Sequence, residues 1–110
     1  MSFEEYQKLA ERTINKNNDS TMNHLHALHG LCAEVGELLS LYQKTYQGHK
    51  LDPVHAKKEL GDLLWFVAEY CTVNGWNMEE IAELNIQKLS ERYPDGFSVE
   101  KSLNRAEGDI

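Results

Sequence analysis

The sequence lacks any long hydrophobic run. No apolar stretch approaches the roughly 18 residues that a membrane-spanning helix needs. The first residues, Met1-Ser2-Phe3-Glu4-Glu5, are acidic where a secretory signal peptide is basic and then apolar. We therefore expect a cytoplasmic protein that does not cross a membrane.

Cysteine is scarce as well. The two cysteines, Cys32 and Cys71, do not form the CxxC spacing that is typical of zinc and redox sites. Both fall at apolar positions of expected helices, where a free cysteine behaves as a small hydrophobic residue. We predict two buried, reduced thiols rather than a disulfide or a zinc site.

An excess of basic charge is also missing. The 110 residues include 11 Lys and Arg against 18 Asp and Glu, which gives a formal net charge of −7. A protein that binds long nucleic acid needs a basic surface, so this class of partner is not expected. An acidic protein can still bind a polyphosphate if metal ions bridge the two sets of anions. The charge is therefore compatible with a nucleotide substrate.

The apolar periodicity predicts four helices and almost no strand, within a single domain that spans residues 1–110. The expected helices cover about residues 2–15, 20–47, 53–74 and 77–92, and a polar tail follows at 97–110. Capping residues support these boundaries: Ser2 with Glu5, Asp19 or Ser20, Asp52 before Pro53, and Asn77 with Glu80. Gly75 should end the third helix. The fold class is therefore all-α.

Two short acidic motifs interrupt the apolar stretches of the second and third helices. They are Glu34-Val35-Gly36-Glu37 and Glu59-Leu60-Gly61-Asp62. Residues three apart on a helix share a face, so each motif presents two carboxylates together. Each motif also lies about 14–15 Å of helix axis from the connecting loop. In an antiparallel hairpin the two motifs would therefore lie side by side.

Four carboxylates in one place repel one another, whereas Mg²⁺ prefers oxygen ligands of this kind. Asp62 also lies in the apolar run Leu60–Ala68, where a charged group is costly without a partner. The motifs therefore predict a magnesium site, with Mn²⁺ as an alternative ion, whose ligands are Glu34, Glu37, Glu59 and Asp62. More than one ion is expected, because Mg²⁺ usually takes only one or two protein carboxylates.

Each motif contains a glycine, Gly36 or Gly61. Glycine inside a helix costs about 1 kcal/mol relative to alanine. The two glycines therefore predict a close approach of another helix or of a ligand.

Three sequence blocks between about His29 and Arg92 carry a family likeness: Gly30–Leu38 with the ExxE motif, Lys58–Phe66 with the ExxD motif, and Asn85–Arg92. By these motifs the chain resembles the MazG-like family of all-α nucleoside triphosphate pyrophosphohydrolases. The resemblance implies a four-helix bundle-like subunit. It also implies assembly into a homodimer or a homotetramer, in which a neighbouring chain can complete the pocket.

The resemblance implies hydrolysis of an NTP or dNTP between the α- and β-phosphates, which yields the monophosphate and pyrophosphate. Bound metal would activate the attacking water, and one carboxylate, which the sequence does not identify, would accept a proton. By the same resemblance, Asn85, Lys88 and Arg92 contact the nucleotide. Their spacing of three and four residues places them on one helix face, from which Arg92 could grip a phosphate bidentately.

Two alternatives stay open at this point. The first is a phosphoribosyl-ATP or dUTP/dCTP-specific hydrolase of the same superfamily, and the second is a non-catalytic helical interaction module with solvated acidic faces. A di-iron carboxylate bundle is disfavoured, because no glutamate has a histidine three residues later. The nucleobase and sugar preferences cannot be read from the sequence.

Histidines and aromatic residues add less specific signals. His24, His26 and His29 do not share one helix face, so we expect a polar helix start or a substrate-facing edge rather than a transition-metal site. We place Trp65 in the core. Phe66, Tyr70 and Trp76 fit either the core or stacking on a nucleobase.

Overall fold

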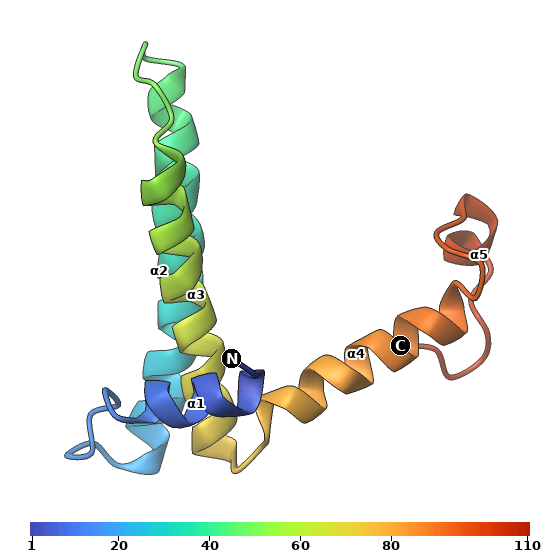
Figure 1. Cartoon of the computed structure of the whole chain (residues 1–110), viewed down its shortest axis with the longest axis horizontal. Coiled ribbons are helices and arrows are strands. Elements are labelled where there is room, and N and C mark those ends of the chain that lie inside the picture. Colours follow the sequence, from blue (N-terminus) through green and yellow to red (C-terminus); the bar gives the residue numbers. More distant parts are fainter. The chain divides into compact units, whose positions relative to one another are not determined.

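A computed structural model describes residues 1–110 and confirms the all-α fold class (Figure 1). The helices are α1 (Phe3–Glu11), α2 (Ser20–Thr45), α3 (Pro53–Asn74), α4 (Met78–Arg92) and α5 (Val99–Leu103). No strand is present, and one isolated β-bridge joins Pro94 to Gly96. None of the helices has the length and apolar character that crossing a membrane requires.

The residues form two compact units, Met1–Met78 and Glu79–Ile110. The first unit contains α1, α2 and α3. The second contains α4 from Glu79 onward and α5. The expectation that residues 1–110 make a single domain stays a prediction.

Local sequence signals set most helix ends. The N-cap residues are Ser2, Asp19 and Asp52, and each side chain accepts a hydrogen bond from a backbone N–H of the first turn. Pro53 follows Asp52 at the start of α3, where its missing N–H costs nothing. Gly75 ends α3 with φ of 71°, a left-handed conformation that glycine adopts without steric cost. These caps confirm the predicted starts of the first three helices.

Helix α1 ends at Glu11, earlier than the expected Asn15. The Thr13 hydroxyl donates to the Ala10 carbonyl at 3.0 Å, and the Asn15 side chain accepts from the backbone N–H of Asn17 at 2.9 Å. Such short-range bonds from threonine and asparagine offer the backbone an alternative to the helix. The polar connector therefore begins four residues sooner than the apolar pattern indicated.

The tail at 97–110 contains the short helix α5, which the sequence analysis missed. Ser98 caps this helix and accepts a hydrogen bond from the backbone N–H of Lys101 at 3.1 Å. The apolar pattern gave no sign of α5, because a five-residue helix is too short to show a periodic face.

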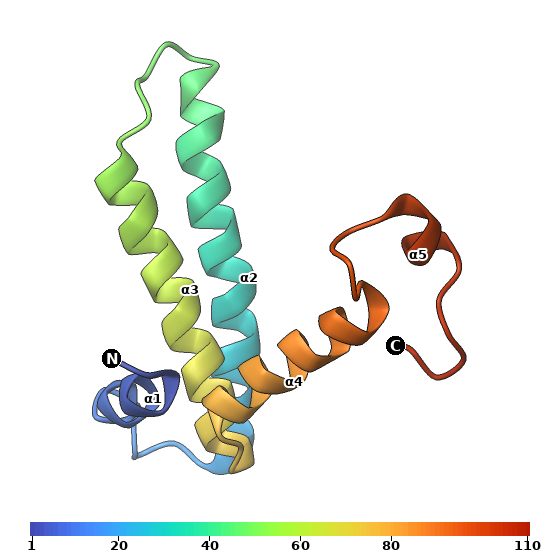
Figure 2. The same ribbon diagram turned by 45° about the vertical axis from the view of Figure 1, so that its right-hand side comes forward.

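Helices α2 and α3 form an antiparallel hairpin and lie side by side in both views (Figures 1 and 2). Helix α1 packs against α3. The core of this unit consists of Ala10, Ala68, Cys71 and Met78, with Tyr6, Leu64, Trp65 and Val67 packed against it. Trp65 also donates its indole N–H to the Thr13 hydroxyl at 2.8 Å. The predictions of a buried Cys71 thiol and of a core role for Trp65 are confirmed.

Cys32 is exposed, so the prediction of a buried thiol is wrong for this residue. It lies on an outward stripe of α2 whose members are spaced by three and four residues and are all exposed: Leu25, Leu28, Cys32, Val35, Leu39 and Tyr42. A different face of α2, with Ala27 and Gly30, is buried. The sequence showed that these positions are apolar but not which of the two faces meets α3.

Gly30 is the glycine of α2 that permits close packing. A Cβ atom at Gly30 would lie 2.1 Å from Cε1 of Phe66 on α3. At Gly36 and Gly61, no atom beyond the adjoining residues and the backbone of the same helix turn comes within 4 Å of such a Cβ. No other helix of this chain therefore makes the expected close approach to these two glycines. The close approach of a ligand stays a prediction.

The two glycines of α2 allow a matched test of this packing. We expect Gly30→Ala to lower the free energy of unfolding by about 1–3 kcal/mol, because the added methyl group overpacks against Phe66. Gly36→Ala should raise it by up to about 1 kcal/mol, because alanine favours the helix and meets no neighbour. Urea unfolding in EDTA, followed by circular dichroism, measures both. A Gly30→Ala protein as stable as Gly36→Ala would contradict the close packing.

Candidate metal centre

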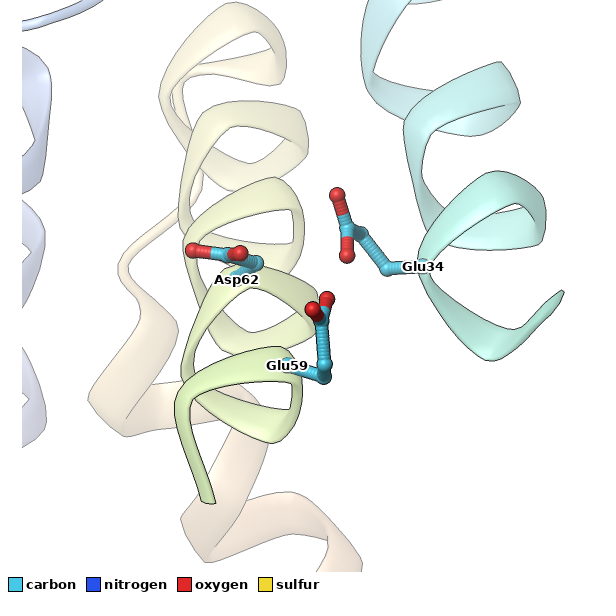
Figure 3. Close-up of side chains that lie close together, drawn as sticks. All are labelled: Glu34, Glu59 and Asp62. Carbon is cyan, nitrogen blue, oxygen red and sulfur yellow. The ribbon is translucent and has the colours of Figure 1, made fainter. Parts of the chain in front are cut away.

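Three carboxylates from α2 and α3 gather at one point of the hairpin (Figure 3). Glu34 extends from α2, and Glu59 and Asp62 extend from α3. Each contributes one oxygen to a group whose members all lie within 4.8 Å of one another. The spacing of three residues puts Glu59 and Asp62 on one face of α3, and the antiparallel packing brings Glu34 to the same level. The convergence of the two motifs is thus present in the fold.

Negative charge is poorly compensated in this group. Glu59 contacts His55, with 3.0 Å between Oε1 and Nε2, and no lysine or arginine forms an ion pair with any of the three carboxylates. The pKa of Glu34 is raised, first by burial and then by its contact with Glu59 and by the charges of Asp62, Glu59 and Glu37. Glu34 therefore binds a proton more readily than an isolated carboxylate does.

Glu34 also has a buried carboxylate oxygen, Oε2, that makes no hydrogen bond. A buried polar atom without a partner is costly, and the cost is greater when the group carries charge. A cation bound to Glu34, Glu59 and Asp62 would satisfy this oxygen and offset the repulsion. All three side chains offer oxygen ligands, which suit hard ions such as Mg²⁺, Mn²⁺ and Ca²⁺. The residues therefore fit a divalent metal ion.

Glu37, the fourth predicted ligand, lies outside the group. Its side chain is exposed on α2, and its influence on the cluster is its charge, which helps to raise the pKa of Glu34. The structure therefore brings together three of the four predicted carboxylates. A direct role for Glu37 at the metal stays a prediction.

The three residues predicted to contact the nucleotide lie on α4, in the unit Glu79–Ile110. Asn85 and Lys88 are exposed. Arg92 is partly buried and donates from Nε and Nη2 to the two carboxylate oxygens of Asp109, each at 2.8 Å. The bidentate grip expected of Arg92 is therefore made here to a carboxylate of the same chain.

Sequence reasoning missed Glu69 of α3, which is 1% exposed. Its two carboxylate oxygens lie 2.8 and 2.9 Å from Nδ1 of His26 on α2. The sequence offered the same clue for Glu69 as for Asp62. Both carboxylates interrupt the apolar part of α3, where a charged group is costly unless it has a partner. His24 instead packs edge-on against Tyr70, which in turn contacts Trp76.

The comparisons with known proteins bear on this site. A model of the MazG nucleotide pyrophosphohydrolase domain family matches residues 22–97, more than half of the chain. The chain belongs to this family. The MazG match includes both acidic motifs and the three α4 residues, and it confirms the resemblance expected from the sequence. Comparisons with curated proteins and with solved structures gave no match.

Membership of the MazG family makes the chain a nucleotide pyrophosphohydrolase domain in general terms. A cluster of oxygen ligands between α2 and α3 agrees with the divalent metal that the family uses. The matched range ends at residue 97. Helix α5 and Asp109 therefore lie outside it.

Metal binding should be visible in thermal unfolding. We expect Mg²⁺ to raise the midpoint of the wild-type protein relative to EDTA, because an ion that binds only the folded state adds about 2.7 kcal/mol at one hundred times its dissociation constant. Glu34→Gln should show a smaller Mg²⁺ shift. Glu83→Gln removes an exposed carboxylate of α4 and serves as the control. Equal Mg²⁺ shifts for all three proteins would contradict the site.

The same variant tests the repulsion without metal. Because the folded-state pKa of Glu34 is raised, the folded protein holds this proton more tightly than the unfolded chain does. In EDTA, the wild type should therefore lose stability relative to Glu34→Gln as the pH rises above 4.5, the ordinary pKa of glutamate. In more acidic buffer, where Glu34 is protonated, the difference in stability between the two proteins should disappear.

Proposed function

We propose that this chain is a divalent-metal-dependent nucleoside triphosphate pyrophosphohydrolase. It cleaves an NTP or dNTP between the α- and β-phosphates and releases the monophosphate and pyrophosphate. The observation that carries the proposal is the convergence of Glu34, Glu59 and Asp62 within 4.8 Å in a MazG domain. Mg²⁺ is the proposed ion and Mn²⁺ the alternative.

Each carboxylate has a role in this proposal. Glu34, Glu59 and Asp62 hold the cation through their oxygens. The bound cation supplies charge neutralisation for the phosphates and lowers the pKa of a bound water. Glu37 lies one turn from Glu34 on α2, is exposed and is outside the ligand group, so its carboxylate is our candidate to accept the proton of the attacking water.

The phosphates of the nucleotide are the proposed ligands of Asn85, Lys88 and Arg92. Arg92 already holds a planar oxyanion bidentately, which is the geometry that guanidinium groups use for phosphate. Lys88 adds a point charge, and Asn85 adds an amide.

A homodimer, or a tetramer built from such dimers, is part of the proposal. The outward stripe of α2 repeats at spacings of three and four, which is the pattern of a helix seam that packs against another helix. Leu39 on this stripe is 62% exposed in the single chain. A second copy of the chain, packed through the same stripe, would bury it in a symmetric contact.

Product analysis tests the reaction. The wild type with Mg²⁺ should release pyrophosphate from at least one nucleotide in a panel of NTPs and dNTPs, and EDTA should abolish the release. Orthophosphate as the first product would place the cleavage elsewhere. Preference for dUTP, dCTP or phosphoribosyl-ATP would select one of the narrower hydrolases, and no turnover at all would favour an interaction module.

Carboxamide variants separate the roles of the carboxylates. Glu59→Gln and Asp62→Asn should lose the Mg²⁺ stabilisation and lower kcat by more than about a hundredfold, because the metal contributes several kcal/mol to the transition state. Glu37→Gln should lose turnover but keep the Mg²⁺ stabilisation. Glu83→Gln should behave as wild type. If Glu37→Gln loses metal binding as well, Glu37 is a ligand rather than the base.

Light scattering coupled to size exclusion tests the dimer. We expect the wild type to show at least twice the mass of the chain, and Leu39→Glu to shift toward the monomer because it places a charge in the buried seam. Leu103→Glu changes a 77% exposed leucine of α5 and is the matched control. A monomeric wild type would remove this part of the proposal.

A further inference from the structure

The ion pair between Arg92 and Asp109 lies in a pocket of the unit Glu79–Ile110 that is lined by both cationic and acidic side chains. The pocket has a volume of about 560 Å³. Its cationic lining residues are Lys88, Arg92, Lys101 and Arg105, and its acidic ones are Glu91, Glu107 and Asp109. The Arg92 side chain is 9% exposed and the Asp109 side chain 14%. The contact is therefore a shielded, bidentate pair rather than a loose surface contact.

The cations around the Asp109 carboxylate favour a negative charge at that position. Arg92 lowers the pKa of Asp109 most, through two hydrogen bonds, and the charges of Arg105 and Lys88 lower it further. Three cations from two parts of the chain therefore act on one carboxylate. A phosphate group placed at the same point would meet the same three cations.

Arg92 already uses one edge of its guanidinium group for a bidentate contact. The Nε and Nη2 edge is taken by Asp109, and the guanidinium carbon lies 5.8 Å from the ring centre of Tyr93. Carboxylate and phosphate bind arginine through the same pair of parallel hydrogen bonds. An anion that binds the Nε and Nη2 edge of Arg92 must therefore displace Asp109.

We propose that Asp109 is a built-in competitor for the phosphate group of the ligand at Arg92. Its carboxylate occupies the phosphate position while the pocket is empty, and it leaves when a polyphosphate binds to Arg92, Lys88 and Arg105. This inference rests on the proposed function, in which Arg92 contacts the nucleotide phosphates, and it adds Arg105 and the segment Ala106–Ile110 to that site.

The backbone around Asp109 allows this exchange. Gly108 has φ of 84°, a left-handed conformation that residues other than glycine rarely adopt. At this residue the chain turns back toward α4. The turn is closed by a single backbone hydrogen bond, from Asp109 N–H to the Ala106 carbonyl, at 3.1 Å. The segment is not helical, so its departure breaks little regular structure.

The competition predicts a defined change in affinity. If Asp109 occupies Arg92 nine-tenths of the time, the apparent dissociation constant of a phosphate ligand is about tenfold weaker than its intrinsic value. Removal of the Asp109 charge should therefore strengthen the apparent affinity for the phosphate ligand by about the same tenfold factor. The return of Asp109 would also weaken the hold on the product pyrophosphate.

Calorimetric titration with inorganic tripolyphosphate in EDTA tests this exchange, because the carboxylate cluster cannot contribute metal there. Asp109→Asn should bind tripolyphosphate about three- to tenfold more tightly than wild type. Asp95→Asn, which changes an exposed aspartate of the turn after α4, should match wild type. Unchanged or weaker binding by Asp109→Asn would mean that the ion pair is structural only and would overturn the proposal.

A second measurement uses the wild type, so a variant that fails to fold cannot obscure the result. The Arg92 Nε–H resonance, assigned by its loss in Arg92→Lys, should shift on addition of tripolyphosphate and not on addition of the same ionic strength of chloride. No shift at saturating tripolyphosphate would also overturn the proposal. If instead the wild type releases no pyrophosphate from any nucleotide, the proposed function fails, while these two measurements still decide whether Asp109 competes.

Discussion

The repulsion among Glu34, Glu59 and Asp62 is the constraint on which this structure depends. Without an ion, the hairpin must hold three carboxylates within 4.8 Å and leave Glu34 Oε2 buried without a partner. Packing elsewhere along the same helices supplies the opposing force. Phe66 lies against Gly30, and the core around Cys71 ties α3 to α1. The proposed ligands are therefore held in position without an ion, which is what tight and selective metal binding needs.

The small core of residues 1–78 explains the composition of α2. Few apolar side chains are fully buried, and α2 keeps one apolar stripe toward solvent while its opposite face meets α3. Such a helix carries two seams, one for its own hairpin and one for a partner. Glu34 belongs to the face toward α3 and Val35 to the outward stripe. The metal site and the proposed dimer contact thus use neighbouring residues of one helix without competing for them.

Local signals in the sequence predicted much of this arrangement. The caps at Ser2, Asp19 and Asp52 act between neighbouring residues, and the ExxE and ExxD spacing follows from helix geometry, so both could be read from the chain. The contacts that were missed join distant residues. Glu69 meets His26 across 43 positions, and Arg92 meets Asp109 across 17. Periodicity also could not choose between the two apolar faces of α2, which is why Cys32 was misplaced.

Electrostatics connects the two sites. A chain with a formal net charge of −7 repels a polyphosphate unless cations intervene, and the proposal supplies them from two places: an ion bound to the α2–α3 carboxylates and the basic side chains around Arg92. The second source brings a difficulty, because unpaired cations would also retain the product anion. In our proposal, an aspartate that returns to Arg92 reduces this difficulty, since it weakens the binding of substrate and product alike and so speeds the loss of the product. The proposal therefore gives Asp109 a part in phosphate binding and release beside the cations that surround it.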